Sequence, residues 1–247
     1  MDEPVQPPTI LVVQNDPDKS AGRIGAALEA EGARLDVRFS RDELPDVAAF
    51  DGLIVLPGLA DPDDDDPALD RIRATITRAI DEAIPVLGIC LGGQLLAQVL
   101  GGSTYACTPE VGFHDVRTTS AASGDPLFRG APATYPSFHA HAYAFQPPED
   151  ATILLENDTC VQACRLGEAW AIQCHPEPDV GWVDGLARAL RDDPDGVARR
   201  TAAFFRQHGV DPAQLERDAR AADASATVVA SSIAAGFASR LAAARTG

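Results

Sequence analysis

The sequence predicts an α/β fold: one domain with a mostly parallel open sheet flanked by helices, an antiparallel extension and extra helices at the C-terminus. Three observations lead to this prediction. Short apolar runs alternate with longer runs of helical periodicity, as in strand–helix–strand units. The chain has 247 residues, of which 45% are hydrophobic, enough to bury one large core. Finally, a cysteine among glycines lies where an apolar run meets a helical one.

The first half is regular. Its apolar runs predict parallel strands, and the stretches between them predict helices on the faces of the sheet. In the longest of these helices, isoleucine and leucine recur every three or four residues, which marks one buried face. In chain order we expect a strand Thr9–Val13, a helix about Ser20–Gly32, strands Leu35–Phe39 and Gly52–Leu56, a helix about Ala68–Ala83, a strand Pro85–Ile89 and a helix about Leu91–Leu100.

The second half is less regular and predicts the antiparallel extension. Short β-like pieces occur at Val116–Thr119, Thr152–Leu155 and Val161–Arg165, followed by a buried strand, Ala169–Cys174. After Pro194, the alanine-rich segments Asp195–His208 and Asp211–Arg245 are expected to be helical. We expect them to pack on the same domain, so that residues 1–247 form one unit with a core of about 9–190 and a helical extension of about 191–247.

Composition narrows the range of partners. A formal net charge of −17, with Lys19 as the single lysine, argues against nucleic acid and anionic membrane surfaces. The five cysteines are odd in number, form no C-x-x-C pair and follow no secretory leader, which favours a reducing cytoplasm. The most apolar stretch, Ala226–Leu241, is interrupted by serines, a glycine and an arginine, so we expect no membrane span.

The segment Gly88–Gln94 carries the clearest chemical signal. It places Cys90 between glycines at a strand-to-helix junction, where small neighbours let a reacting carbonyl approach. The following helix points its N-terminal dipole at the sulfur, which favours the thiolate. A lone cysteine in an apolar segment can also be a small buried hydrophobe, so a base is needed elsewhere.

A candidate base follows the strand Ala169–Cys174. His175 and Glu177 can place an imidazole against the thiol and a carboxylate against the imidazole. In parallel sheets the ligand crevice lies beyond the carboxyl ends of the strands. Gly58, Cys90 and His175 each come just after a predicted strand. They are therefore expected to meet at one edge.

These motifs resemble those of the class I, or triad, glutamine amidotransferases. The likeness rests on the G-x-C-x-G-x-Q elbow Gly88–Gln94 and the tripeptide His175–Glu177, about 85 residues apart. It extends to the Gly58 loop, to Glu110–Phe113, which matches an E-x-G-aromatic element, and to Ser137–His141. The resemblance covers roughly residues 9–190 and is nearest to stand-alone domains of the GMP-synthase type. It implies a flavodoxin-like sheet.

The resemblance implies that Cys90, His175 and Glu177 hydrolyse the side-chain amide of glutamine through a glutamyl thioester. The backbone N–H groups of Leu91 and of the Gly58 loop would face the oxyanion. By analogy, Gln94 and the backbone near Phe138–His141 would hold the α-amino and α-carboxylate groups. His139 and His141 alternate as on a strand, so we expect them to face opposite ways, with one of them lining the pocket.

No cofactor and no metal is expected. The acidic run Asp61–Asp66 lacks the ligand spacing of a calcium loop and is interpreted as solvated. Cys160, Cys164 and Cys174 match no structural zinc spacing. His114 and His208 are expected to be structural or exposed.

Three functions stay open at this point. The chain could be a glutaminase that delivers ammonia to a separate synthase, since it carries no G-x-x-x-x-G-K-[ST] loop. It could be a self-sufficient amidase or γ-glutamyl hydrolase acting on a small glutamyl amide. It could also be a binding or regulatory protein without turnover, although the intact Cys90, His175 and Glu177 argue against this.

Overall fold

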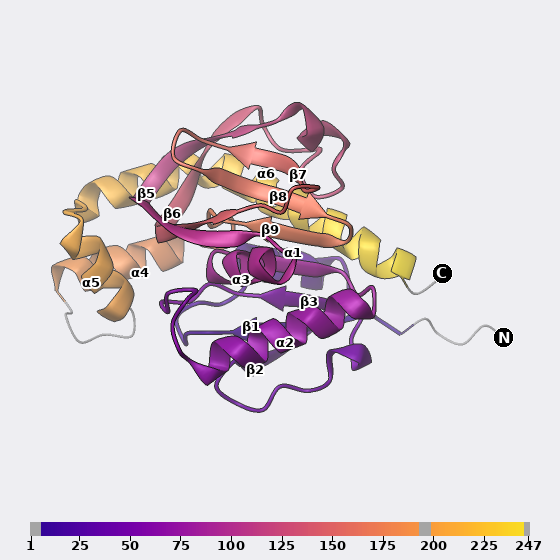
Figure 1. Cartoon of the computed structure of the whole chain (residues 1–247). Helices are drawn as coiled ribbons and strands as arrows, with labels where there is room; N and C mark the ends of the chain where they lie inside the picture. Colours follow the sequence, from indigo (N-terminus) through magenta and orange to yellow (C-terminus); the bar gives the residue numbers. More distant parts are fainter. Residues whose placement is uncertain (1–5, 193–198, 245–247) are drawn as a thin grey trace.

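The sheet has two halves of different pairing. A computed structural model of the chain describes residues 6–192 and 199–244. Within this part, nine strands form one sheet in the order β2-β1-β3-β4-β9-β8-β7-β5-β6. Neighbours are parallel from β2 to β9 and antiparallel from β9 to β6, as the lower and upper parts of Figure 1 show. The strands are β1 Thr9–Gln14, β2 Arg34–Phe39, β3 Gly52–Val55, β4 Val86–Ile89, β5 Ser103–Thr118, β6 Thr134–Gln146, β7 Thr152–Glu156, β8 Val161–Leu166 and β9 Ala169–Ile172.

Helices cover both faces of the parallel half of the sheet, and three helices pack together beside β6. The helices are α1 Gly22–Ala30, α2 Pro67–Asp81, α3 Leu91–Val99, α4 Val180–Arg191, α5 Arg199–Gln207 and α6 Pro212–Ala244, with short 3-10 turns at Val47–Ala49 and Ser120–Gly124. One core cluster joins the sheet to α1 and α6, and a second joins it to α2 and α3. In Figure 1, α2 and α3 lie on the near face and α6 runs behind. A third cluster packs α4, α5 and the start of α6 around Phe138.

Local sequence explains where these elements begin. The side chain of Asp66 accepts a hydrogen bond from the Ala68 N–H, and Pro67 occupies the first turn of α2. Leu69, Ile72 and Ile76 lie on one face of this helix and are buried. The strands β1, β3 and β4 are almost wholly buried because helices cover both of their faces.

The predicted α/β fold class is confirmed, and the elements of the first half lie within a few residues of their predicted positions. The antiparallel half is larger than predicted. The piece Val116–Thr119 is only the end of the 16-residue strand β5, and the 13-residue strand β6 was not predicted. β5 carries a proline and a register shift between Ala106 and Glu110, and much of its length is exposed, so it shows no apolar run.

The C-terminal segments are helical where the structure describes them, and α4 is an additional helix that was not predicted. Residues 195–198 of the first predicted helix and Arg245 of the second lie outside the described residues. By length and composition, Pro212–Leu241 of α6 could cross a membrane, contrary to the expectation from sequence. In this fold its buried side chains, among them Ile233, Phe237 and Leu241, instead pack in the core against the sheet.

Candidate active site

Cys90 lies at a strained junction between β4 and α3. Its backbone has φ 51° and ψ −111°, a left-handed φ that favours glycine. Two hydrogen bonds hold it there: the Cys90 N–H donates to Ile172 O at 2.7 Å, and the Gln94 N–H donates to Cys90 O at 2.9 Å. The conformation sets the sulfur at the N-terminus of α3, as predicted for a nucleophile.

Glycines let α3 approach the sheet at backbone distance. A Cβ on Gly88 would lie 2.4 Å from Gly92 O, and one on Gly92 would lie 2.1 Å from Val55 O. A Cβ on Gly93 would lie 2.6 Å from Ile172 O. These glycines therefore fix how close the helix that carries Cys90 sits to β3, β4 and β9.

Gly92→Ala is expected to destabilise the protein strongly, because the new methyl group would meet backbone that cannot rotate away. The expected loss is about 3 kcal/mol or more of unfolding free energy, at the upper end for overpacked cores. Gly124→Ala is the control, since nothing lies within 4 Å of its added Cβ. Urea unfolding of both variants measures the difference, and equal midpoints would contradict the proposed contact.

His175 and Glu177 form a buried pair just after β9. His175 Nδ1 lies 2.7 Å from Glu177 Oε1, and both side chains are almost fully buried. The backbone N–H of His175 donates to the backbone oxygen of Phe138 at 2.8 Å, and the Phe138 ring packs edge-on against the imidazole. These contacts hold the imidazole in one orientation.

The charge environment of His175 favours its protonated form. Burial alone would lower its pKa, but Glu177 and then Cys90 raise the pKa of His175 to about 9. The other ring nitrogen, Nε2, is buried and has no hydrogen-bond partner of ordinary length among the described residues. Because Nδ1 is held by Glu177, Nε2 is the ring nitrogen left to serve a reacting group.

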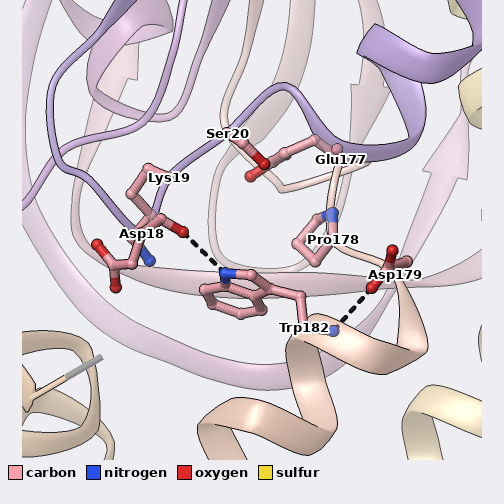
Figure 2. Close-up of a pocket in the computed structure, with 8 residues that line it drawn as sticks. Asp18, Lys19, Ser20, Glu177, Pro178, Asp179 and Trp182 are labelled. Carbon is pink, nitrogen blue, oxygen red and sulfur yellow. Dashed lines mark hydrogen bonds between the residues drawn. The ribbon is translucent and has the colours of Figure 1, made fainter. Parts of the chain in front are cut away.

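Behind Glu177 lies a small cavity of about 140 Å³ that Figure 2 shows. Lys19, which is buried, points its Nζ at the Trp182 ring, 4.7 Å from the centroid. Burial lowers the pKa of Lys19, whereas Asp18 and Glu177 raise it. Nearby, the backbone N–H of Arg23 donates to the backbone oxygen of Glu177 at 2.9 Å. The first turn of α1 thus holds the backbone of Glu177, and the segment before α1 places the amine of Lys19 near the Glu177 carboxylate.

A separate pocket of about 100 Å³ opens beside Cys90. It is lined by Gly58 to Pro62, Cys90, Gln94, Ala140 to Tyr143, and Phe204 of α5. The Gly58 loop is tied down by the Asn15 amide, which donates to Leu56 O, and by Asp16, whose carboxylate accepts from the Leu59 N–H. The pocket suits a small polar substrate reaching the thiol.

The structure separates the residues predicted to bind substrate into two groups. Gly58, Gln94 and His141 line the pocket, and Leu91 opens α3 directly after Cys90. Gln94 is fixed by donating its amide to Tyr143 O at 2.8 Å. Phe138 and His139 do not line this pocket: Phe138 packs against His175, and His139 is fully buried.

The expectation that His139 and His141 face opposite ways is wrong. Residues two apart on a strand point to the same side, and both rings turn toward Glu110. His141 Nε2 lies 3.3 Å and His139 Nδ1 lies 3.7 Å from Glu110 Oε2, and the two ring nitrogens are 3.4 Å apart. Burial would raise the pKa of Glu110, but His141, His139 and Asn157 lower it to about 2.

The four other cysteines differ from Cys90 in position and surroundings. Burial raises the pKa of Cys107 to about 11 and those of Cys164 and Cys174 to about 12, and it also raises the pKa of Cys160. All five are free thiols. The acidic run Asp61–Asp66 is largely exposed, and His114 and His208 are exposed, as expected.

Sequence reasoning gave no role to three residues near the site. Phe204 lies in a helix beyond the motifs, and Lys19 showed only as a count in the composition. Glu110 appeared only as part of a motif. No local pattern marks Phe204 or Lys19, and the motif that contains Glu110 does not show its role, because each of the three reaches the site through long-range packing.

Sequence comparison places the chain in a family. The family model described as glutamine amidotransferase class-I matches residues 22–182. The chain therefore belongs to the class I glutamine amidotransferases, and it is an enzyme of that class.

Among named relatives, the chain is 32% identical to the imidazole glycerol phosphate synthase subunit HisH of Synechococcus sp. (strain JA-2-3B'a(2-13)), over 74% of this chain and 92% of that subunit. It is 31% identical to the putative glutamine amidotransferase-like protein YfeJ of Salmonella typhimurium, over 58% of this chain and 63% of YfeJ. A solved glutamine amidotransferase from Thermotoga maritima has a TM-score of 0.79 at 21% identity and covers 94% of this chain and 97% of its own. That likeness extends the shared fold beyond the motifs to nearly the whole chain.

Proposed function

We propose that this chain hydrolyses the side-chain amide of glutamine with Cys90 as nucleophile, His175 as acid and base, and Glu177 as the group that orients His175. The observation that carries the proposal is the buried 2.7 Å pair of His175 and Glu177 beside a cysteine at a strained elbow. A positioned nucleophile, base and orienting carboxylate are the elements of acyl transfer.

In the first half-reaction, the Cys90 thiolate adds to the carboxamide carbon. Protonated His175 beside the sulfur favours the thiolate by charge pairing. Negative charge on the carbonyl oxygen is met by the N–H of Leu91 and an N–H of the Gly58 loop. The carbon–nitrogen bond then breaks, His175 Nε2 gives its proton to the leaving nitrogen, and ammonia departs from a glutamyl thioester.

In the second half-reaction, neutral His175 takes a proton from water, and the hydroxide attacks the thioester carbon. The carbon–sulfur bond breaks, glutamate leaves and the thiolate returns. Glu177 keeps the Nδ1 proton of His175 in place throughout, so that Nε2 always faces the reacting atoms.

The ammonia is proposed to pass to a separate synthase. The relatives named as subunits of imidazole glycerol phosphate synthase and of GMP synthase support this view. The test is release of ammonia and glutamate from L-glutamine, measured with and without a synthase co-purified from the native host. Stimulation by the synthase is expected. Unchanged turnover across candidate synthases would favour a self-contained enzyme.

A second candidate is hydrolysis of a γ-glutamyl amide without a partner. Phe204 of α5 lines the pocket, so a segment beyond the matched family region completes the pocket from within the chain. If this holds, some γ-glutamyl amide should exceed L-glutamine in kcat/KM. A panel of such amides that all fall below L-glutamine would count against it.

Phe204→Ala is expected to raise KM for the preferred amide about fivefold, which corresponds to about 1 kcal/mol of lost apolar contact. Its kcat should change by less than about twofold, since the ring does not touch the triad. Phe39→Ala on β2 is the control, because that ring is 42% exposed and does not line the pocket. Steady-state kinetics of both variants test the assignment, and a Phe204→Ala variant with unaltered KM would remove Phe204 from the site.

We also propose a reducing, cytoplasmic setting and no binding of nucleic acid. Five free thiols and the net charge of −17 support both.

A further inference from the structure

Behind the pocket wall, five potential ligand side chains gather where β5, β6 and the start of β8 meet. Glu110, His139, His141 and the thiols of Cys107 and Cys160 lie within a few ångströms of one another. The imidazole, carboxylate and sulfur atoms of His141, Glu110 and Cys160 all lie within 4.8 Å of each other. The proposed hydrolysis uses none of these groups chemically.

Four of the six distances among the donor atoms are close to the edges of a zinc tetrahedron. Zn²⁺ bonds of roughly 2.0–2.3 Å to nitrogen, oxygen and sulfur place neighbouring ligand atoms roughly 3.3–3.7 Å apart. Around Glu110 Oε2 the distances are 3.3 Å to His141 Nε2, 3.7 Å to His139 Nδ1 and 3.8 Å to Cys160 Sγ. The two imidazole nitrogens are 3.4 Å apart.

Neighbouring side chains form hydrogen bonds to some of these donor atoms and so restrict their orientation. The Asn157 amide donates to Glu110 Oε1 at 2.6 Å, and the Gln162 amide donates to Glu110 Oε2 at 2.9 Å. His141 Nδ1 lies 3.8 Å from Cys107 Sγ, which leaves Nε2 as the ligand atom. The Asn157 and Cys107 contacts lie on the far side of Glu110 and His141, an arrangement typical of metal sites. The Gln162 amide instead contacts the ligand oxygen itself and also lies 3.2 Å from Cys160 Sγ.

We propose that Glu110, His141 and Cys160 bind one Zn²⁺ ion, with His139 Nδ1 beside Glu110 and His141 as a fourth donor. The mixed nitrogen, oxygen and sulfur donors suit Zn²⁺ better than Mg²⁺ or Ca²⁺. Binding releases the thiol proton of Cys160 to solvent, and the ion offsets both the burial of the thiolate and its repulsion from Glu110. His141 also lines the pocket beside Cys90, so the ion fixes one wall of that pocket.

Sequence spacing could not reveal this site. Glu110 and His141 are register partners in the pairing of β5 with β6, and Cys160 reaches Glu110 from the loop before β8. The zinc pattern considered from sequence combined Cys160 with Cys164 and Cys174, and only Cys160 belongs to this cluster.

The test uses untagged, chelator-treated full-length protein carrying Cys90→Ala, so that the catalytic thiol cannot bind metal. Co²⁺ serves as the spectroscopic probe for Zn²⁺. We expect one Co²⁺ per chain, with visible bands of tetrahedral coordination and a thiolate charge-transfer band. Zn²⁺ should displace Co²⁺ and raise the melting temperature.

Adding Cys160→Ala is expected to abolish the thiolate band and to weaken Zn²⁺ binding at least about tenfold. The matched control Cys164→Ala should retain both. His141→Gln should also weaken binding at least about tenfold, which keeps the test decisive if Cys160→Ala does not fold. Absence of Co²⁺ uptake, or a thiolate band that survives Cys160→Ala, would overturn the proposal.

Discussion

Cys90→Ala is expected to abolish glutamine hydrolysis, with a loss of at least about 10⁴-fold in kcat, because no other group in the site can form the thioester. Burial raises the pKa of each of the other four thiols, and Cys90 is the cysteine at the N-terminus of α3. The assay is ammonia release from L-glutamine at saturating substrate.

The fold should survive this change. Alanine keeps the Cβ at φ 51°, so the backbone strain stays the same and only a small buried sulfur is lost. Cys90→Gly is a useful control: it is equally inactive but is expected to be more stable than Cys90→Ala by about 1 kcal/mol, since glycine relieves the left-handed conformation. A Cys90→Ala variant that is folded and retains turnover would refute the mechanism.

Glu177→Gln is expected to lower kcat about 10²–10⁴-fold and to change the pH dependence, because glutamine neither holds the Nδ1 proton as a carboxylate does nor stabilises the imidazolium. In the wild type, activity should decline as the pH rises through about 9, the pKa of His175, as the acid that protonates ammonia is lost. In the variant this alkaline limb should move to lower pH.

The same pKa predicts a contribution to stability. The pKa of His175 in the folded protein, about 9, lies above its ordinary value of 6.5. The pair with Glu177 therefore stabilises the fold fully below pH 6.5, and this stabilisation is lost as the pH rises through 9. Thermal melts of the wild type and of Glu177→Gln at several pH values between 6.5 and 9 measure this stabilisation. A constant difference in melting temperature across that range, with an unmoved alkaline limb, would contradict the role assigned to Glu177.

Much of the parallel half was predictable because its strands are buried on both faces and therefore appear as unbroken apolar runs. Cys90 and His175 were placed correctly because each follows such a run at the carboxyl end of the sheet. The long strands β5 and β6 could not be found this way. β5 is half-exposed, each strand contains a proline, and the two are joined with a register shift. β6 is largely buried, but polar residues such as His139 and His141 interrupt its apolar pattern.

One physical reason explains why some residues of the site were not predicted. Lys19, Phe204 and Glu110 reach the site through packing between segments far apart in the chain, so even the motif that contains Glu110 does not show its contacts with His139 and His141. The orientation of His139 and His141 follows from strand geometry once β6 is known, since residues two apart share a face.

The central claim is that Cys90 attacks the amide carbon of glutamine. The most direct measurement is covalent labelling with an L-glutamine analogue that carries a chloromethyl ketone in place of the carboxamide, followed by peptide mass spectrometry. The mechanism predicts one label per chain, on the sulfur of Cys90, slowed by excess L-glutamine. It also predicts slower labelling in His175→Ala, because the imidazolium that favours the thiolate is gone. Labelling of another cysteine at the same rate, or labelling of Cys90 that L-glutamine does not slow, would contradict the assignment of this site.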